Sequence, residues 1–387
     1  MGRTGRVMAR IAGAFEHPLR HIPDRSLESV QLEIAAGALA DAGLGPGDVD
    51  ALFTSVTPGG PLALAELLGL ANLRHVDGTD LGGATYVASL GAAARAIQAG
   101  RCRVALIIHA GLPRQGIVQR GAPPAPMLPF EAAHGSTLIA QYALVARRHM
   151  YEYGTTREDL AHIKVAASHH ASFNPNALLR DRVTVAEVLD SPPIAEPLHR
   201  LDCCVTTDGG GALVVVANEI AEELGRPCPG ILAEAETVRH WNNGDLDLTV
   251  TGAARTGPRA FADAGLTPAD IDYASLYDSF TITVLTALED LGFCAKGEGG
   301  KFVRDGALHA PHGRLPVNTD GGGLANNHPD RRGGMIRAIE AVRQLRGAAH
   351  PELQVPDCEF ALVHGSGFSL GSRASAATAI LCRGDVK

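Results

Sequence analysis

The feature that most constrains this chain is an internal repeat. The stretch ALADAGLGPGDVDALFTS, from Ala38, is similar to AFADAGLTPADIDYASLYDS, from Ala260. Each predicts the end of an amphipathic helix, a glycine C-cap, a proline turn and a β-strand. Two further pairs follow in the same order: CRVALIIHAG with CEFALVHGSG, and GGGALVVVA with RASAATAILC. Three matches in one order indicate that a unit was duplicated.

The repeat also predicts the fold class and the division into domains. Strands that alternate with helices favour α/β sheets covered by helices. We expect an N-terminal half over residues 1–220 and a C-terminal half over residues 228–387. A stretch from about residue 113 to 200 interrupts the first half, and it contains the proline-rich loops GAPPAPMLPFEA and SPPIAEP. We interpret this stretch as an inserted loop domain over a site.

Composition excludes several classes of function. The 387 residues carry a net charge of −8 with scattered Lys and Arg, which argues against a nucleic-acid surface. No apolar run is long enough for a membrane span, and the N-terminus lacks the core of a signal peptide. The seven cysteines form no CxxC pair, so we expect reduced thiols, no metal site in this chain and a cytoplasmic location.

Four stretches carry a resemblance to a known family. They are LYDSFTITVLTALEDLGFCAKGEGGKFV, LPVNTDGGGLANNHPDRRGGM, ALVHGSGF and the segment from Tyr153 to Val215. With the duplication, they resemble the thiolase superfamily, and most closely its sterol-carrier-protein-type thiolases and lipid-transfer proteins. The resemblance implies a thiolase fold, which is a duplicated five-layer αβαβα architecture with an inserted loop domain. It also implies acyl-CoA substrates and a homodimer.

The same resemblance locates the site. Thiolases carry a nucleophilic cysteine at a helix N-terminus, where the helix dipole and free N–H groups lower the thiol pKa. That position falls on Gly83, and the family's second cysteine falls on His364. The Asn-Glu-Ala-Phe signature, His-Asp-Cys-Phe in the sterol-carrier branch, is Tyr277-Asp278-Ser279-Phe280 here, and the Gly-His-Pro signature is Asn327-His328-Pro329.

A glycine at the nucleophile position removes the acyl-enzyme step, because glycine has no side chain to acylate. Acid–base chemistry on a bound CoA ester remains. The resemblance implies that His328 stabilises charge on the thioester oxygen and that Tyr277, His364 and Asp278 move or support protons. Which residue is the base and which the acid is left open. The expected substrate or CoA contacts are Gly83, Asn326, Asn327, Arg331, Arg332, Gly365 and Ser366.

One branch of the superfamily matches this residue set. The thiolase-like aldolases of steroid side-chain degradation lack the nucleophilic cysteine and cleave a β-hydroxyacyl-CoA by a retro-aldol step. The resemblance therefore implies an acyl-CoA aldolase, with a steroid side-chain CoA ester as substrate and a ketone and a short acyl-CoA such as propionyl-CoA as products. This chain departs from that branch at Asn326 and Asn327, where a second tyrosine is expected.

The resemblance also suggests a partner and leaves two alternatives open. Relatives work with a small protein that combines an OB fold with a zinc ribbon, which implies a heterotetramer whose zinc is held by the partner; this chain needs no cofactor of its own. The first alternative is a thiolase-type acyltransferase that uses a relocated cysteine, with Cys203, Cys204 and Cys294 as candidates. The second is a non-catalytic subunit that binds CoA or lipid.

Overall fold

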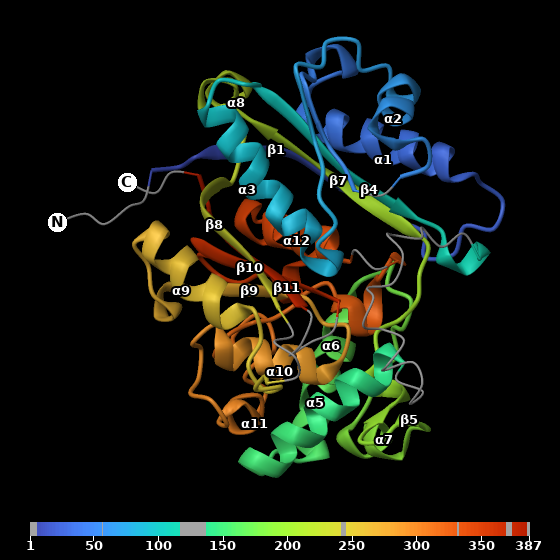
Figure 1. The fold of residues 1–387 in the computed structure, drawn as a ribbon, viewed down its shortest axis with the longest axis vertical. Helices are drawn as coiled ribbons and strands as arrows, with labels where there is room; N and C mark the ends of the chain where they lie inside the picture. The colour runs from blue at the N-terminus through green and yellow to red at the C-terminus, as the bar shows by residue number, and fades with distance from the viewer. Residues whose placement is uncertain are drawn as a thin grey trace.

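The computed structural model describes residues 6–55, 57–116, 137–240, 245–330, 333–368 and 374–384 (Figure 1). One mixed sheet runs through them in the strand order β3-β2-β4-β7-β1-β8-β11-β10-β9. Its first five strands are β1 (Ala9–Glu16), β2 (Ala51–Phe53), β3 (His75–Asp77), β4 (Val104–Gly111) and β7 (Gly209–Val216). The other four are β8 (Gly230–Arg239), β9 (Tyr273–Leu276), β10 (Phe360–Phe368) and β11 (Ala374–Cys382).

The two halves of the sheet have the same plan, read outward from the centre. Strands β1 and β8 pair antiparallel in the middle. From β1 outward, β7 and β4 follow antiparallel, and β2 and β3 follow parallel. From β8 outward, β11 and β10 follow antiparallel and β9 follows parallel, with a parallel bridge from Ala274 to Val317 at the place of β3. The predicted duplication is confirmed by this matching order and direction.

Helices divide the molecule into five layers (Figure 1). The helices α1 (Leu27–Ala42), α2 (Gly60–Leu68) and α8 (Asn218–Leu224) share one apolar core with the outer face of the first half. The helices α3 (Thr85–Gln98) and α12 (Gly334–Arg346) lie in the middle and share a second core with strands of both halves. The helices α9 (Ala253–Ala264) and α10 (Thr281–Asp290) cover the outer face of the second half.

The predicted helix ends are confirmed in both repeats. Helix α1 begins after Ser26, whose side chain accepts the Ser29 N–H, and ends at Gly43 with φ 72°. Helix α9 ends at Gly265 with φ 69°. Glycine adopts this left-handed conformation without the Cβ clash that other residues suffer. In each repeat a short 3₁₀ turn that begins with proline then leads into the strand.

The inserted segment packs on the half of the molecule to which it does not belong in sequence. It contains α5 (Leu138–Tyr153), α6 (Arg157–Phe173), α7 (Val185–Asp190), β5 (Pro193–Ala195) and β6 (Leu198–His199), between β4 and β7. Its buried residues Val145, Leu160 and Ile163 belong to the same apolar core as Leu285 of α10. This packing brings helices from the first half against the site-bearing loops of the second, where the short helix α11 (Gly299–Phe302) also lies.

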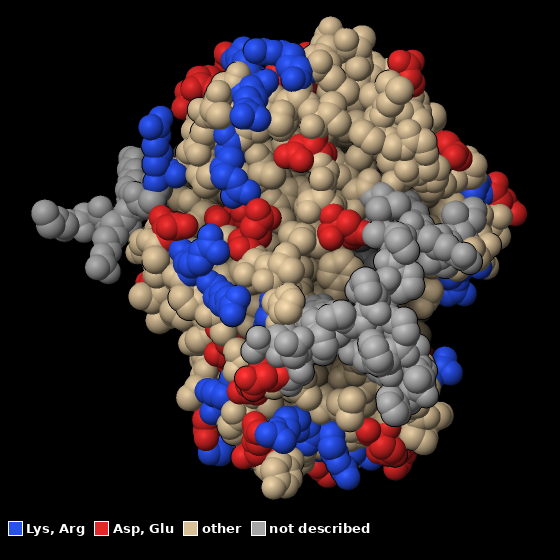
Figure 2. Space-filling model, in the orientation of Figure 1, with Lys and Arg blue, Asp and Glu red and all other residues tan. Residues whose placement is uncertain are grey.

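Charge on the surface is mixed. On the face seen in Figure 2, Lys and Arg side chains lie interspersed with Asp and Glu, not gathered into one basic stripe. Among the helices that the structure describes, none is both long and apolar enough to cross a lipid bilayer.

Candidate active site

The site forms where the N-termini of the two central helices meet. Gly83 lies in the 3₁₀ turn Gly82–Ala84 that leads into α3. A Cβ added to Gly334, the first residue of α12, would lie 2.1 Å from the Gly83 carbonyl oxygen, and one added to Gly365 of β10 would lie 2.7 Å from it. Glycine at both positions permits this close approach of backbone to backbone. Helix N-termini favour negative charge, so an anionic intermediate would be stabilised here.

The space beside Gly83 is filled by a tyrosine. A Cβ added to Gly83 would lie 2.4 Å from both Cε2 and Cζ of Tyr277, and 2.3 Å from the carbonyl oxygen of Ser366. Tyr277 follows β9 directly, and its N–H donates to the carbonyl of His364 at 2.9 Å. A phenol ring therefore occupies the volume into which a side chain at position 83 would project.

Tyr277 and His328 form a hydrogen-bonded pair. The phenol oxygen lies 2.9 Å from His328 Nε2, with Tyr277 buried and His328 partly buried. Burial raises the pKa of Tyr277 well above its ordinary value. Burial also lowers the pKa of His328 to about 4. Both groups are therefore uncharged near neutral pH, and the pair can pass a proton between oxygen and nitrogen without an ion being present at rest.

Residues from both halves hold the loop that carries His328. The His328 N–H donates to Thr207 Oγ1 at 2.9 Å, and that hydroxyl donates to Asn327 Oδ1 at 2.6 Å. The ring of His109, at the end of β4, lies 2.8 Å from the carbonyl oxygen of Pro329 through its Nε2. The imidazole of His328 is thus fixed by backbone and side-chain contacts on each side of it.

Asp278 lies behind the pair as a support. Its carboxylate accepts the N–H groups of Gly323 at 2.8 Å and Leu324 at 3.1 Å. Both belong to a π-helical turn, Gly322–Asn326, and such turns are frequent at functional sites. Burial raises the pKa of Asp278 above its ordinary value. A Cβ added to Gly323 would lie 2.9 Å from the Asp278 carboxylate and 3.0 Å from the His328 ring, so this turn connects the two residues.

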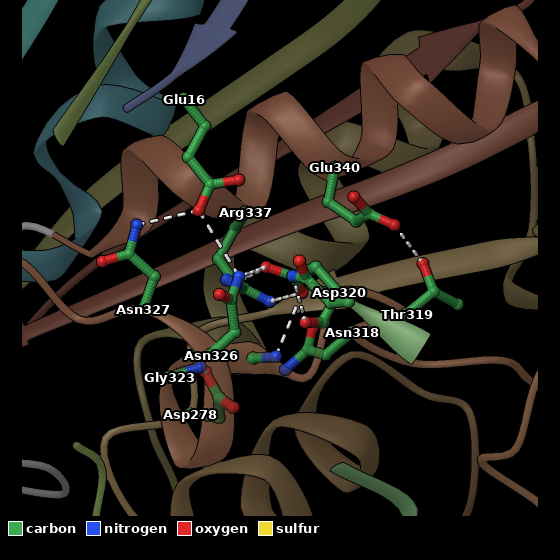
Figure 3. A network of polar contacts seen from close by, with 12 residues as sticks. Glu16, Asp278, Asn318, Thr319, Asp320, Gly323, Asn326, Asn327, Arg337 and Glu340 are labelled. Atoms are coloured by element: carbon green, nitrogen blue, oxygen red, sulfur yellow. Dashed lines mark hydrogen bonds and ion pairs between the residues drawn. The ribbon is translucent and has the colours of Figure 1, made fainter. Parts of the chain in front are cut away.

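Asn326 and Asn327 lie in a buried polar network (Figure 3). Asn326 Oδ1 accepts from the Arg20 guanidinium at 2.8 Å and 3.1 Å, and its amide donates to Asp320 at 2.8 Å. The Asn327 amide donates to Glu16 at 2.8 Å. Arg337 of α12 binds Asp320 through two nitrogens at 2.9 Å and 2.7 Å. The two asparagines thereby join β1, the π-helical turn and α12, and contact of either with substrate stays a prediction.

The other expected site residues are placed less directly. The imidazole of His364 points to the side of the sheet that α9 covers, where its Nδ1 lies 2.9 Å from Thr378 Oγ1. The contact of His364 with Tyr277 is through its backbone carbonyl alone. Burial lowers the pKa of His364 to about 4. Among the described residues, the buried Ser366 hydroxyl has no hydrogen-bond partner. Arg331 and Arg332 lie outside the residues that the structure describes.

The cysteines are not activated. A nucleophilic cysteine needs a lowered pKa, because the thiolate is the reactive form. Burial raises the pKa of Cys203 to about 11 and of Cys204 and Cys294 to about 12. Burial likewise raises the pKa of the other four cysteines, which are Cys102, Cys228, Cys358 and Cys382. Within the described part of the chain, no cluster of three or more His, Cys, Asp or Glu could hold a metal ion.

Comparisons with known proteins identify the family of this chain. A family described as "Thiolase C-terminal domain-like" matches residues 235–383. An acetyl-CoA acetyltransferase of Methanothermobacter thermautotrophicus is 34% identical over 94% of this chain and 97% of its own length. The chain belongs to the thiolase superfamily.

Two similar proteins of this superfamily are named as aldolases. A steroid side-chain-cleaving aldolase of Thermomonospora curvata is 36% identical over 88% of this chain and 91% of its own length. The solved structure named Ltp2-ChsH2(DUF35) aldolase is 34% identical, covers 97% of this chain and 98% of its own, and superposes with a TM-score of 0.88. The predicted thiolase fold and the prediction of a carbon–carbon lyase of the thiolase superfamily are confirmed by these similarities.

Lys164 is the residue near the site that sequence reasoning missed. It lies on α6, is 1% exposed, and donates to the carbonyl of Leu324 in the π-helical turn at 2.7 Å. A signal existed in the composition, because the chain contains only four lysines and thirty arginines. An isolated lysine in such a chain is a candidate for a specific contact.

Proposed function

We propose that the protein is an acyl-CoA aldolase that cleaves a β-hydroxyacyl-CoA by a retro-aldol reaction, with no acyl-enzyme. The observation that carries the proposal is the pairing of Gly83 with Tyr277. The phenol ring fills the volume of the missing nucleophile, and its hydroxyl lies 2.9 Å from His328. A thiolase active site altered in this way retains proton donors and acceptors and has no group to acylate.

The proposed mechanism begins with the Tyr277–His328 pair. The phenol oxygen takes the proton of the substrate's β-hydroxyl while its own proton passes to His328 Nε2. A high pKa disfavours a free phenolate, so this relay moves the proton without forming one. The Cα–Cβ bond then breaks, the Cβ–oxygen bond becomes a ketone, and the electron pair enters the thioester as an enolate. The new imidazolium and the two helix N-termini stabilise that negative charge.

The second step returns the proton. His328 passes it back through Tyr277 to Cα of the enolate, which yields the shorter acyl-CoA and restores both neutral side chains. The low pKa of His328 favours this return, because its imidazolium is a strong acid in the buried site. Asp278 and the π-helical turn keep the imidazole in place during both transfers. Contacts of Gly365 and Ser366 with the substrate belong to the same proposal, and His364, whose imidazole binds Thr378, contributes the carbonyl that accepts the Tyr277 N–H.

We propose a steroid side-chain CoA ester as the substrate, with a ketone and a short acyl-CoA such as propionyl-CoA as products. Support comes from the Thermomonospora relative, which is a steroid side-chain-cleaving aldolase. We propose further that the chain forms a homodimer which binds two copies of a small OB-fold zinc-ribbon protein. The name of the solved structure includes a second component, ChsH2 with a DUF35 domain, and that supports a small partner.

The test is a product and adduct assay. The purified protein, with its co-purifying partner, is incubated with a β-hydroxyacyl-CoA of the proposed class, and ketone and acyl-CoA are followed by chromatography. Intact-protein mass spectrometry is run during turnover. We expect products without a mass increase. A stable acyl adduct on a cysteine would instead support the acyltransferase function of the Methanothermobacter relative, and tight CoA-ester binding without turnover would support a binding subunit.

The partner is tested in the same preparation. Pull-down of the chain with small proteins that co-purify with it, followed by size-exclusion chromatography and zinc analysis, should give a complex with zinc in proportion to the partner. A chain that elutes alone and turns over at the full rate would contradict the heterotetramer while leaving the aldolase proposal intact.

A further inference from the structure

Lys164 is a buried lysine near the candidate site in a chain that otherwise uses arginine for most of its cations. The chain contains four lysines against thirty arginines, yet the one cation on α6 that faces the site is a lysine and is 1% exposed. Burying an ammonium group is costly unless it is paired and hydrogen bonded. A lysine offers a compact charge on a slim stem, whereas an arginine offers a broad planar fork. Such a choice fits a contact with one backbone oxygen.

The contact is with the residue that Asp278 already holds. Lys164 Nζ donates to the carbonyl of Leu324 at 2.7 Å, and the Asp278 carboxylate accepts the N–H of Leu324 at 3.1 Å. One residue of the π-helical turn is therefore bound at its N–H by an anion and at its carbonyl by a cation. The turn ends two residues before His328, so its geometry sets where the imidazole meets Tyr277.

The charges around Lys164 come from three elements. Asp278, from the connection between β9 and α10, and Asp202, from the turn that precedes β7, both favour the charged lysine. Arg337 of α12 faces Asp278 from the other side. Burial outweighs the two carboxylates and lowers the pKa of Lys164 to about 8. The ammonium is therefore present at neutral pH and is lost as the pH rises above that value.

We propose that Lys164 is a positioning residue of the lyase site, a role that rests on the proposed function: its ammonium, bound to the Leu324 carbonyl, fixes the π-helical turn and so the contact between His328 and Tyr277. The inserted loop domain thereby contributes to catalysis through α6, and deprotonation of Lys164 releases the turn. Neutral lysine still has N–H donors, but it loses the attraction to Asp278 that keeps the side chain at the turn.

The experiment compares Lys164→Met with Lys301→Met. Lys301 has a side chain that is 72% exposed and pairs with Glu298 on the surface. For Lys164→Met we expect kcat to fall at least tenfold with KM changed less than about twofold, because substrate contacts are kept while proton transfer is misaligned. The wild-type fall in kcat above about pH 8 should be absent from the residual activity. Lys301→Met should match wild type in every respect. A folded Lys164→Met variant with wild-type kcat and pH profile would overturn the proposal.

A second measurement does not depend on turnover. With only four lysines, ¹³Cε-lysine labelling gives few signals, and the signal of Lys164 is assigned by a Lys164→Gln variant. We expect this signal to titrate near pH 8 together with the His328 ring signal. Titration of the His328 signal without that of Lys164 would overturn the proposal. Absence of cleavage by wild type would contradict the aldolase function, and the paired titration would still decide whether Lys164 controls His328.

Discussion

The two halves of the molecule share one plan and contribute different things to the site. Each half carries a central helix whose N-terminus points to the same place, α3 from the first half and α12 from the second. The first half brings bare backbone there, at Gly83. The second half brings the phenol of Tyr277, the imidazole of His328 and the supporting Asp278. The duplicated plan supplies the two helix N-termini, and the chemistry depends on which half carries polar side chains beside them.

The two halves also differ in how they hold the site: one contributes close backbone packing and the other contributes buried charges. The first half brings its backbone close to that of the second half at Gly83, and its residues His109 and Thr207 bind the loop that carries His328. The second half is stabilised by buried charge, with Arg337 and Asp320 at its centre. If this division is correct, changes in the second half should strongly reduce turnover and stability. Changes in the first half should act by altering the packing around the site.

The largest expected effect is that of Tyr277→Phe. Phenylalanine keeps the ring that fills the space beside Gly83 and removes the hydroxyl that contacts His328. We expect turnover to fall by about 10²–10⁴-fold, the usual contribution of a positioned acid–base group. Binding of the CoA ester, measured by calorimetry, should persist. Tyr151→Phe, at an exposed tyrosine on α5, is the matched control, and equal turnover in the two variants would contradict the role of Tyr277.

The next effect is on stability. Arg337 and Asp320 form a buried, bidentate ion pair in the network that carries Asn326 (Figure 3). Arg337→Met leaves Asp320 buried without that partner, so we expect the free energy of unfolding to fall by about 3–5 kcal/mol. Urea unfolding measures it. Arg226→Met, which removes a partly exposed ion pair with Asp41, should cost no more than about 1 kcal/mol. Similar losses for the two variants would show that the buried network carries no special weight.

The difference between the two halves is tested further by placing a thiol at Gly83 in the first half. Gly83→Cys forces a Cβ against the Tyr277 ring and the Ser366 carbonyl. We expect a loss of about 1–3 kcal/mol in the free energy of unfolding, as for other overpacked cores, together with loss of cleavage. Gly47→Cys is the control, because a Cβ there meets nothing within 4 Å. A Gly83→Cys variant that is as stable as wild type would mean that the tyrosine does not occupy this space in solution.

The smallest expected effect concerns the buried imidazole of His364. Its pKa is lowered from 6.5 to about 4 by burial, so the unfolded chain binds a proton at higher pH than the folded chain does. Stability is therefore complete above about pH 6.5 and is lost as the pH falls toward 4. At about pH 5.5 the cost is roughly 1.4 kcal/mol for this one residue. His364→Gln should show a shallower fall in urea midpoint between pH 7 and 5.5, and an unchanged slope would contradict its burial as a neutral ring.

Much of the framework could be predicted from the sequence because its signals are local. The glycine C-caps at Gly43 and Gly265, the proline turns and the apolar strands each depend on a few neighbouring residues, and all were predicted correctly. Short motifs were enough to single out Tyr277 and His328, which the structure brings within 2.9 Å of each other. Local signals cannot report which side of a strand an imidazole faces, and the position of His364 toward Thr378 follows from the packing of α9 on the sheet.

The sequence by itself determined that the chain is built twice on one α/β plan and that no thiol stands at the helix entrance. Only the tertiary structure decided that a phenol fills the space beside Gly83 and that Lys164 reaches the π-helical turn. It also decided that the amides of Asn326 and Asn327 are hydrogen bonded to Glu16, Arg20 and Asp320. The physical reason is that most of these contacts join residues far apart in sequence, such as Lys164 with Leu324, 160 positions apart, and Asn327 with Glu16, 311 positions apart. Short-range patterns set the elements, and the long-range packing of buried polar groups, each of which must find a partner, sets the site.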